Sequence, residues 1–252
     1  MNELDFYQKI KNWDFSKIKY VSENFTNWDM YEELKRSSNK ESKILDLGTG
    51  GGEKVLTYFP ECTEILGTDF SSEMVSTANK NLKNSGKKNI HFRVMDNLHM
   101  DTNDNYFDIV VARHTCIDAK QIYSTLKDGG KLILRGVDKL DCWALKRMFN
   151  KGQAYKDPKP ISVIDYENII EAGFKNVELI PIHIKEYFES KEDLLALLLK
   201  TPILEDFSEI DDNKNLGVSV IDETILDKYI KENTFEKGIL LIRRYYGIVA
   251  VK

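Results

Sequence analysis

The sequence predicts an α/β protein built on a doubly wound, mostly parallel β-sheet, with further segments before and after it. Three observations support this prediction. From residue 43 onward, short apolar runs alternate with helical patterns, as in strands joined by helical crossovers. The first apolar run leads into a glycine-rich turn. Acidic or amide residues lie at or just after the ends of the first three strands, and such residues at the carboxyl ends of parallel strands meet along one edge of a sheet.

The stretch 43–53 combines a strand, a turn and the start of a helix. The strand is Ile44–Leu47, glycines occupy positions 48, 50, 51 and 52, and a helical pattern begins at Glu53. Glycine lets a ligand approach the main chain without a Cβ in the way, and a helix N-terminus presents unpaired N–H groups. The stretch therefore predicts a nucleotide-type crevice at the end of the first strand.

The spacing in this turn favours a ligand with an amino group over a pyrophosphate. The dinucleotide fingerprint G-x-G-x-x-G would begin at Gly48 and need a third glycine where this chain has Glu53. An alternative pattern, an acidic residue followed by alternate glycines, is filled by Asp46 and the glycines at 48, 50 and 52. A carboxylate at this position attracts a cation and repels a phosphate. A nicotinamide-dependent oxidoreductase is therefore the least favoured enzyme class.

The second strand, Glu64–Thr68, ends in Asp69. A carboxylate at this place can accept both hydroxyl groups of a bound ribose. Asp69 could instead cap the helix that follows, but Ser71 and Ser72 are available for that role. This helix is expected to stop at residues 84–86, which read Asn-Ser-Gly.

The third strand, Ile90–Val94, is followed closely by Asp96 and Asn97. Their carboxylate and amide groups can hydrogen-bond the amino group and a ring nitrogen of adenine. The other interpretation is a plain turn. The fourth strand is Phe107–Ala112, and residues 128–130, Asp-Gly-Gly, form a turn into the fifth strand at 131–134.

These residues resemble the class I S-adenosylmethionine-dependent methyltransferases over roughly residues 43–136. The resemblance implies a Rossmann-like methyltransferase fold with a seven-stranded sheet. It also implies S-adenosylmethionine as cofactor and S-adenosylhomocysteine as product. The implied cofactor-binding residues are Asp46, Gly48, Thr49 and Gly50 for the methionine part, Asp69 for the ribose, Phe70 and Met74 beside the adenine, Asp96 and Asn97 at the adenine edge, and Arg113 at the methionine end.

His114 is the candidate catalytic residue. An imidazole can take a proton from a hydroxyl or amine near neutral pH. Alternatively, His114 only packs or hydrogen-bonds locally, because methyl transfer from a sulfonium often needs alignment alone. Cys116 is less favoured as a nucleophile. The residues 112–116, Ala-Arg-His-Thr-Cys, also lack the Asn/Asp-Pro-Pro-aromatic loop of many enzymes that methylate base amino groups in nucleic acids.

The sequence predicts that the chain has four parts. Residues 1–42 form an N-terminal helical cap, 43–184 the cofactor-binding core, 185–236 a helical insertion or lid, and 237–252 the strands that complete the sheet. The aromatic residues of the cap cover the sheet edge, line an acceptor pocket, or do both; they are Trp13, Phe15, Phe25, Trp28 and Tyr31. Five leucines between 194 and 199 predict core packing, with a dimer contact or a pocket wall as alternatives.

Later segments continue the alternation. Helices are expected at Lys139–Phe149, at Ser162–Glu171 and at Asp222–Lys231, with a strand at Lys175–Ile184 between the second and third of them. Two β-rich runs, 238–242 and 247–251, flank Arg243 and Arg244. The last strand, 248–251, should enter the sheet antiparallel to the fifth. The two arginines either reach an anionic acceptor or occupy an exposed hairpin tip.

Composition limits the functional classes. The 252 residues are 42% apolar with a formal net charge of −5, so a folded protein is expected and nucleic acid is an unlikely partner. Three scattered cysteines argue against a structural metal site and for a reduced compartment. The sequence has no membrane-span pattern, and we expect a cytoplasmic protein. The basic stretch 146–159 is either a solvated loop or a site for an anionic partner such as RNA.

The leading hypothesis is a methyltransferase that acts on a small-molecule acceptor by in-line displacement, as a monomer or a homodimer. An RNA methyltransferase that uses residues 146–159 is the second hypothesis, and it predicts salt-sensitive RNA binding. A binding module that holds S-adenosylmethionine without catalysis is the third. The sequence does not identify the acceptor.

Overall fold

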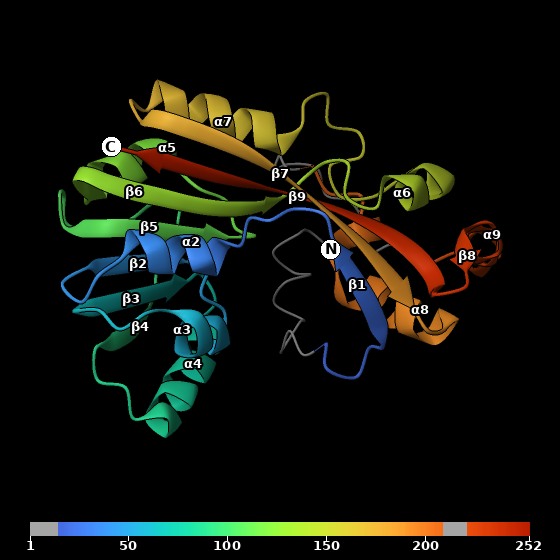
Figure 1. Ribbon diagram of the computed structural model, residues 1–252, viewed down its shortest axis with the longest axis horizontal. Coiled ribbons are helices and arrows are strands. Elements are labelled where there is room, and N and C mark those ends of the chain that lie inside the picture. The colour runs from blue at the N-terminus through green and yellow to red at the C-terminus, as the bar shows by residue number, and fades with distance from the viewer. Residues whose placement is uncertain (1–14, 209–220) are drawn as a thin grey trace. The chain divides into compact units, whose positions relative to one another are not determined.

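The computed structural model describes residues 15–208 and 221–252, which contain a single nine-stranded sheet (Figure 1). The strands are β1 (Tyr20–Asn24), β2 (Lys43–Leu47), β3 (Glu64–Asp69), β4 (Ile90–Val94), β5 (Phe107–Arg113), β6 (Leu126–Val137), β7 (Lys175–Phe188), β8 (Thr234–Phe235) and β9 (Gly238–Val251). The helices are α2 (Met30–Ser37), α3 (Glu53–Tyr58), α4 (Ser72–Ser85), α5 (Ala119–Thr125), α6 (Trp143–Phe149), α7 (Ile161–Glu171), α8 (Lys191–Lys200) and α9 (Glu223–Asn233), with a short 3₁₀ turn at Pro202–Leu204.

The strand order confirms the predicted α/β sheet. It is β1-β7-β9-β6-β5-β2-β3-β4, and β8 pairs with β9. The pairs β2–β3, β2–β5, β3–β4 and β5–β6 are parallel. Strand β9 runs antiparallel to β6, as predicted, because Lys252 N donates to Gly130 O (2.9 Å) and Asp138 N donates to Arg244 O (3.1 Å). All seven predicted strands form, and β1 and β8 are additional.

Strand β1 corrects the prediction of a wholly helical N-terminal segment. Of the described residues before β2, only α2 is a helix, and Tyr20–Asn24 pairs antiparallel with β7. The register places Tyr20 opposite Phe188 and Asn24 opposite Ile184. Strand β7 continues past its predicted end at Ile184, and this extension provides the hydrogen-bonding edge on which β1 forms. Trp13 lies outside the described residues.

The chain divides into two compact units whose boundaries differ from the four predicted segments. The core unit comprises Trp28–Gly136, Ser162–Ile180 and Tyr246–Lys252. The accessory unit comprises Val137–Ile161, Pro181–Tyr245 and Met1–Asn27, within the described residues. Strands β7 and β9 each contribute residues to both units. Because these strands are long, the unit boundaries fall within strands and not at loops.

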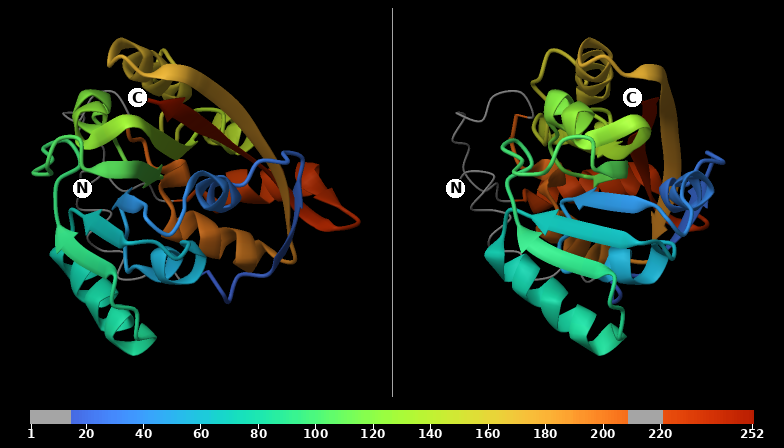
Figure 2. Two further views of the ribbon diagram at one scale, coloured as in Figure 1. Left: turned by 60° about the vertical axis from the view of Figure 1, so that its left-hand side comes forward. Right: turned by 90° about the vertical axis from the view of Figure 1, so that its left-hand side faces the viewer.

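The core unit buries both faces of its parallel strands. One hydrophobic cluster joins α2, α3 and α4 to the sheet through residues such as Leu34, Val55 and Ala78. Along β5, Ile109 and Val111 belong to this cluster, while the residues between and after them are also fully buried. Alternate strand residues point to opposite faces, so both faces are covered. Figure 2 shows α4 alongside β3 and β4.

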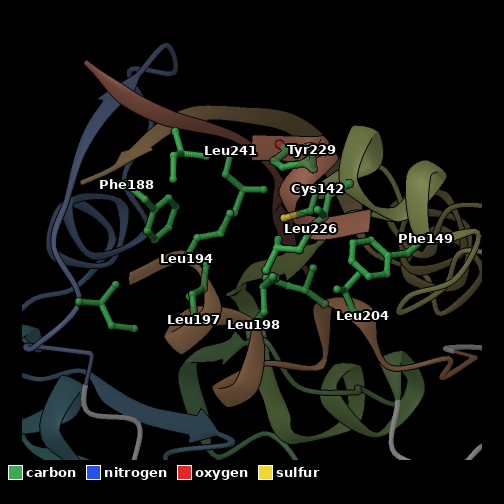
Figure 3. Packing of buried hydrophobic residues seen from close by; sticks show 14 residues of the cluster. Cys142, Phe149, Phe188, Leu194, Leu197, Leu198, Leu204, Leu226, Tyr229 and Leu241 are labelled. Atoms are coloured by element: carbon green, nitrogen blue, oxygen red, sulfur yellow. The ribbon is translucent and has the colours of Figure 1, made fainter. Parts of the chain in front are cut away.

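The accessory unit has its own hydrophobic cluster, which α6, α8 and α9 form with strand residues (Figure 3). Leu194, Leu197 and Leu198 of α8 are buried in it, which confirms that the leucine-rich segment packs as core. Leu199 is 65% exposed. Residues 209–220 of the predicted insertion lie outside the described residues.

The predicted exposed hairpin tip at Arg243 and Arg244 does not form, and that prediction is wrong. Gly238–Val251 is one continuous strand, and Arg243 within it is buried. Its guanidinium donates to the Asp141 carboxylate from Nε (3.0 Å) and Nη2 (3.1 Å), and to Glu186 Oε2 from Nη1 (3.2 Å). Because Arg243 is engaged inside the accessory unit, it does not reach out to an anionic acceptor.

The basic stretch 146–159 is solvated only in part, because Arg147 and Lys156 are exposed whereas Lys146 is not. Lys146 is fully buried, and its Nζ donates to the carbonyl oxygens of Gln153 (2.8 Å) and Lys139 (3.3 Å). Lys156 pairs with Asp206 at 2.6 Å. Lys146 therefore serves the packing of this segment, whereas the charges of Arg147 and Lys156 face solvent.

Two boundaries also differ from the prediction. Strand β6 begins at Leu126, before residues 128–130, because the pairing with β5 shifts register there and continues. Helix α6 begins at Trp143 and not at Lys139, after turns in which Asp138 accepts from Leu140 N (2.8 Å). Within the described residues, no helix has the length and apolar character needed to cross a membrane.

Candidate functional site

The turn between β2 and α3 holds its glycines in the left-handed region. The φ angles are +73° at Gly48, +59° at Gly50 and +78° at Gly52, a conformation that costs glycine little. A Cβ on Gly48 would lie 2.8 Å from Thr115 Cβ. The Thr49 backbone N–H donates to a carbonyl of β3 (2.8 Å). Larger residues would therefore disturb both the turn and its packing against the loop after β5.

Asp69, at the end of β3, holds this turn in place. Its Oδ2 accepts from Gly50 N (2.8 Å), and its Oδ1 accepts from Ser71 N (2.9 Å). The α4 cap is Ser71, whose side chain accepts from Met74 N (3.2 Å), so Asp69 is not the helix cap. Each carboxylate oxygen keeps a further lone pair. Sequence reasoning missed the contact with Gly50, which fixes the turn after β2 to the end of the next strand, β3.

Asp46 is buried near the end of β2, with 7% of its surface exposed. Burial raises its pKa to about 7, while the nearby Arg113 guanidinium acts in the opposite direction. A buried carboxylate is costly without a positive partner. The position therefore suits the binding of a cationic group.

Asp96 and Asn97 differ in their partners. The Asp96 carboxylate accepts from Leu98 N (2.9 Å) and pairs with His99 Nδ1 (2.8 Å). The buried Asn97 side chain donates from Nδ2 to Thr115 Oγ1 (2.9 Å). Its Oδ1 is buried and has no hydrogen-bond partner among the described residues. An unsatisfied buried acceptor is unfavourable, so the Asn97 carbonyl is suited to receive a donor from a ligand.

A hollow of ≈ 550 Å³ opens beside β4. It is lined by Phe70, Val94, Met95, Asp96, His99 and Asp101. Phe70 is 54% exposed and Val94 is 52% exposed, so apolar surface faces outward here. Phe70 and Asp96 were predicted site residues, whereas Val94 and His99 were missed. The sequence signal that could have identified Val94 and His99 was their position around the end of β4.

The ends of β5 and β6 bring two arginines side by side. Arg113 and Arg135 are Cα partners in the parallel pairing. His114, with φ of +53°, donates its backbone N–H to Arg135 O (2.8 Å), and Arg135 Nη1 lies 2.7 Å from His114 Nε2. A guanidinium only donates, so Nε2 is the acceptor in this contact. The lone pair that a general base would use is therefore engaged with Arg135.

Tyr31 of α2 is a further residue of the core unit with a buried polar group. Its ring stacks on Tyr58 with centroids 4.8 Å apart. Burial raises the pKa of Tyr31 to about 12, and the charges of Arg113, Asp46 and Arg135 also act on it. The aromatic pattern before β2 drew attention to Tyr31, but it did not indicate that the Tyr31 hydroxyl is buried without a hydrogen-bond partner among the described residues.

Similarity to known proteins identifies the family. A model described as a methyltransferase domain matches residues 38–169. The chain belongs to this family. An uncharacterized methyltransferase of Bacillus subtilis is 27% identical over 101 residues, which cover 37% of this chain and 40% of that relative. A protein-L-isoaspartate O-methyltransferase of Opitutus terrae is 24% identical over 96 residues, which cover 38% of this chain and 41% of that relative.

The similarity to solved structures concerns the fold. A crystal structure of a putative methyltransferase from Bacillus halodurans has a TM-score of 0.59 and 17% identity, with 89% of this chain and 98% of that chain covered. The curated relatives, in contrast, are matched over less than half of their lengths. The methyltransferase domain and its fold are therefore established, whereas the acceptor is not.

The residues of the methyltransferase core fit S-adenosylmethionine, the cofactor of this family. The buried Asn97 Oδ1 has no hydrogen-bond donor within the described chain. The adenine amino group of the cofactor would supply such a donor. Asp46 offers a buried carboxylate for the ammonium group. Asp69 retains acceptor capacity where ribose hydroxyls would lie.

Proposed function

We propose that this methyltransferase transfers a methyl group from S-adenosylmethionine to a small-molecule acceptor by in-line displacement. The observation that carries the proposal is the convergence of Asp46, Asp69 and Asn97 at neighbouring strand ends of the core unit. The net charge of −5 and the internal role of Lys146 favour a small molecule over a nucleic acid.

The proposed cofactor contacts follow the strand ends. Asp46, Gly48, Thr49 and Gly50 hold the methionine part, Asp69 the ribose, Phe70 and Met74 the adenine faces, Asp96 and Asn97 the adenine edge, and Arg113 the methionine end. S-adenosylmethionine supplies an electrophilic methyl group on a positively charged sulfur. The chain itself contributes orientation and the exclusion of water, which together can account for a large part of a rate enhancement.

Calorimetric titration with S-adenosylmethionine and S-adenosylhomocysteine, with NAD as control, tests this proposal. Binding of the first two without binding of NAD is the expected result. Binding of NAD alone would contradict the assignment of the Asp46–Gly52 turn. Binding of S-adenosylmethionine without turnover on any acceptor would instead indicate a module without catalysis.

Cofactor affinity should depend on pH through Asp46. Its pKa is raised to about 7 in the ligand-free protein, and only the ionised carboxylate attracts an ammonium group. The affinity for S-adenosylhomocysteine should therefore fall as the pH decreases from 8 to 6. Titrations at several pH values test this expectation, and D46N should bind weakly with little dependence on pH in this range. An equally steep dependence in D46N would contradict the role of Asp46.

We also propose that His114 is the candidate base if the acceptor must lose a proton. This role requires Arg135 to release the imidazole Nε2. H114A should then lower kcat by roughly 100-fold and change the affinity for S-adenosylhomocysteine much less. The readouts are single-turnover rates and calorimetry on the same preparation, with R147Q as the surface control. An unchanged kcat in H114A would leave alignment as the main catalytic contribution.

A further inference from the structure

Three cationic side chains gather at the carboxyl ends of β2, β5 and β6 in the core unit. Arg113, the last residue of β5, pairs in register with Arg135 of β6. Lys54 lies in the first turn of α3, directly after the glycine turn. Burial lowers the pKa of Lys54, and the positive charges of Arg113 and Arg135 lower it further. Leu47 and Ala112 are Cα partners in the pairing of β2 with β5, so Arg113 ends β5 beside the glycine turn that leads to Lys54.

Aromatic rings connect Lys54 to the buried hydroxyl of Tyr31. Lys54 Nζ lies 5.0 Å from the centroid of the Tyr58 ring, and Tyr58 stacks on Tyr31. The Tyr31 hydroxyl is buried and has no hydrogen-bond partner within the described residues. A buried hydroxyl without a partner is unfavourable. The hydroxyl of Tyr31 is therefore an unused donor on a ring that stacks against the Tyr58 ring, which Lys54 also contacts.

Two of these three cations, Lys54 and Arg113, lack an ion-pair partner in the described part of the chain. The closest acidic influences are Glu53, which raises the pKa of Lys54, and the buried Asp46. Bound S-adenosylmethionine would add a net positive charge, because its ammonium and carboxylate cancel and its sulfonium does not. Clustered like charges are unfavourable, so an anion is needed from outside the chain.

We propose that the acceptor molecule carries a carboxylate or a phosphate monoester, which Lys54 and Arg113 bind beside the hydroxyl of Tyr31. This inference rests on the proposed function and narrows its substrate class. Arginine binds such oxyanions through paired hydrogen bonds, lysine adds a mobile positive charge, and tyrosine donates one hydrogen bond. The anion also draws the acceptor to the methyl-transfer end of the site.

The carboxylate of the cofactor does not account for the whole cluster. It is a single group, and its own ammonium neutralises it. Arg113 lies near Asp46 and could contact that carboxylate, but Lys54 lies on the other side of the glycine turn in the sequence and is linked to Tyr58 and Tyr31. A substitution of Lys54 should therefore affect acceptor binding and leave cofactor binding unchanged.

The test uses the full-length protein saturated with S-adenosylhomocysteine. Inorganic phosphate and acetate are titrated separately at constant ionic strength, with binding followed by calorimetry. K54Q should weaken binding of the preferred anion about tenfold and leave the affinity for S-adenosylhomocysteine within about twofold. Y31F should weaken the anion about threefold. The matched control is K80Q, because Lys80 is exposed on α4 in the same unit, and it should change neither affinity.

The two anions distinguish the two acceptor chemistries, since phosphate binding indicates a phosphate monoester and acetate binding a carboxylate. The proposal is overturned if neither anion binds saturably, or if K54Q binds them as well as the unmodified protein does. Equal losses of anion and S-adenosylhomocysteine affinity in K54Q would also overturn it, because Lys54 would then serve the cofactor. Failure of the unmodified protein to bind S-adenosylhomocysteine would contradict the proposed function instead.

Discussion

Replacing Asp69 with alanine is expected to weaken the binding of S-adenosylhomocysteine about 100-fold, which corresponds to about 3 kcal/mol. The substitution removes two contributions together. It deletes the proposed acceptor for the ribose hydroxyls, and it releases Gly50, whose backbone N–H donates to Asp69 Oδ2 at 2.8 Å. The glycine turn would then lose the contact that fixes it to the end of β3. Calorimetric titration of D69A measures the loss.

The control is D128A, because Asp128 is exposed and lies near the first residue of β6, away from the carboxyl ends of the strands. It should bind S-adenosylhomocysteine like the unmodified protein. A second variant, D69N, separates the two contributions, since an asparagine oxygen can still accept from one backbone N–H. D69N should therefore bind more tightly than D69A. An affinity of D69A within a few-fold of the unmodified protein would contradict the assignment of this site.

The second large effect concerns stability. R243Q is expected to lower the free energy of unfolding by about 3–5 kcal/mol, because it leaves Asp141 and Glu186 buried without their cation. Asp141 is 1% exposed and accepts from both Nε and Nη2 of Arg243. Glu186 accepts from Nη1. Urea denaturation followed by circular dichroism measures the change.

R147Q serves as the matched control for R243Q. Arg147 is an exposed arginine of α6, in the same accessory unit, and its replacement should change stability by less than about 0.5 kcal/mol. A similar small effect in R243Q would mean that the buried cluster does not stabilise the accessory unit. It would instead favour the exposed arginine that the sequence suggested.

Much of the core could be predicted because its signals are local. Ile44–Leu47 and Phe107–Ala112 are continuous apolar runs, which two-sided burial in a parallel sheet requires. Ser71 and Gly86 begin and end α4 as their types indicate, with Gly86 at φ of +70°. The residues after the strands were then placed at one sheet edge by topology alone, which was sufficient to recognise the family.

The accessory unit was harder to predict because its contacts join distant segments. Arg243 meets Asp141 across 102 positions of sequence, and the β-rich runs around it gave no sign of these partners. Strand β1 pairs with an extension of β7, and Tyr20 lies opposite Phe188 in that pairing. Strand pairing depends on the partner as well as on the local sequence, so the segment before β2 was predicted as helical.

The sequence by itself determined the family and its cofactor, because a strand, a glycine turn and an acidic residue are recognisable from short-range chemistry. Only the tertiary structure decided which charges are paired. It placed Arg243 in a buried cluster, joined Asp69 to Gly50, and brought Lys54 and Tyr31 onto the same ring of Tyr58. The physical reason is that the strength of an interaction between charges depends on their distance and burial, which the order of residues does not specify.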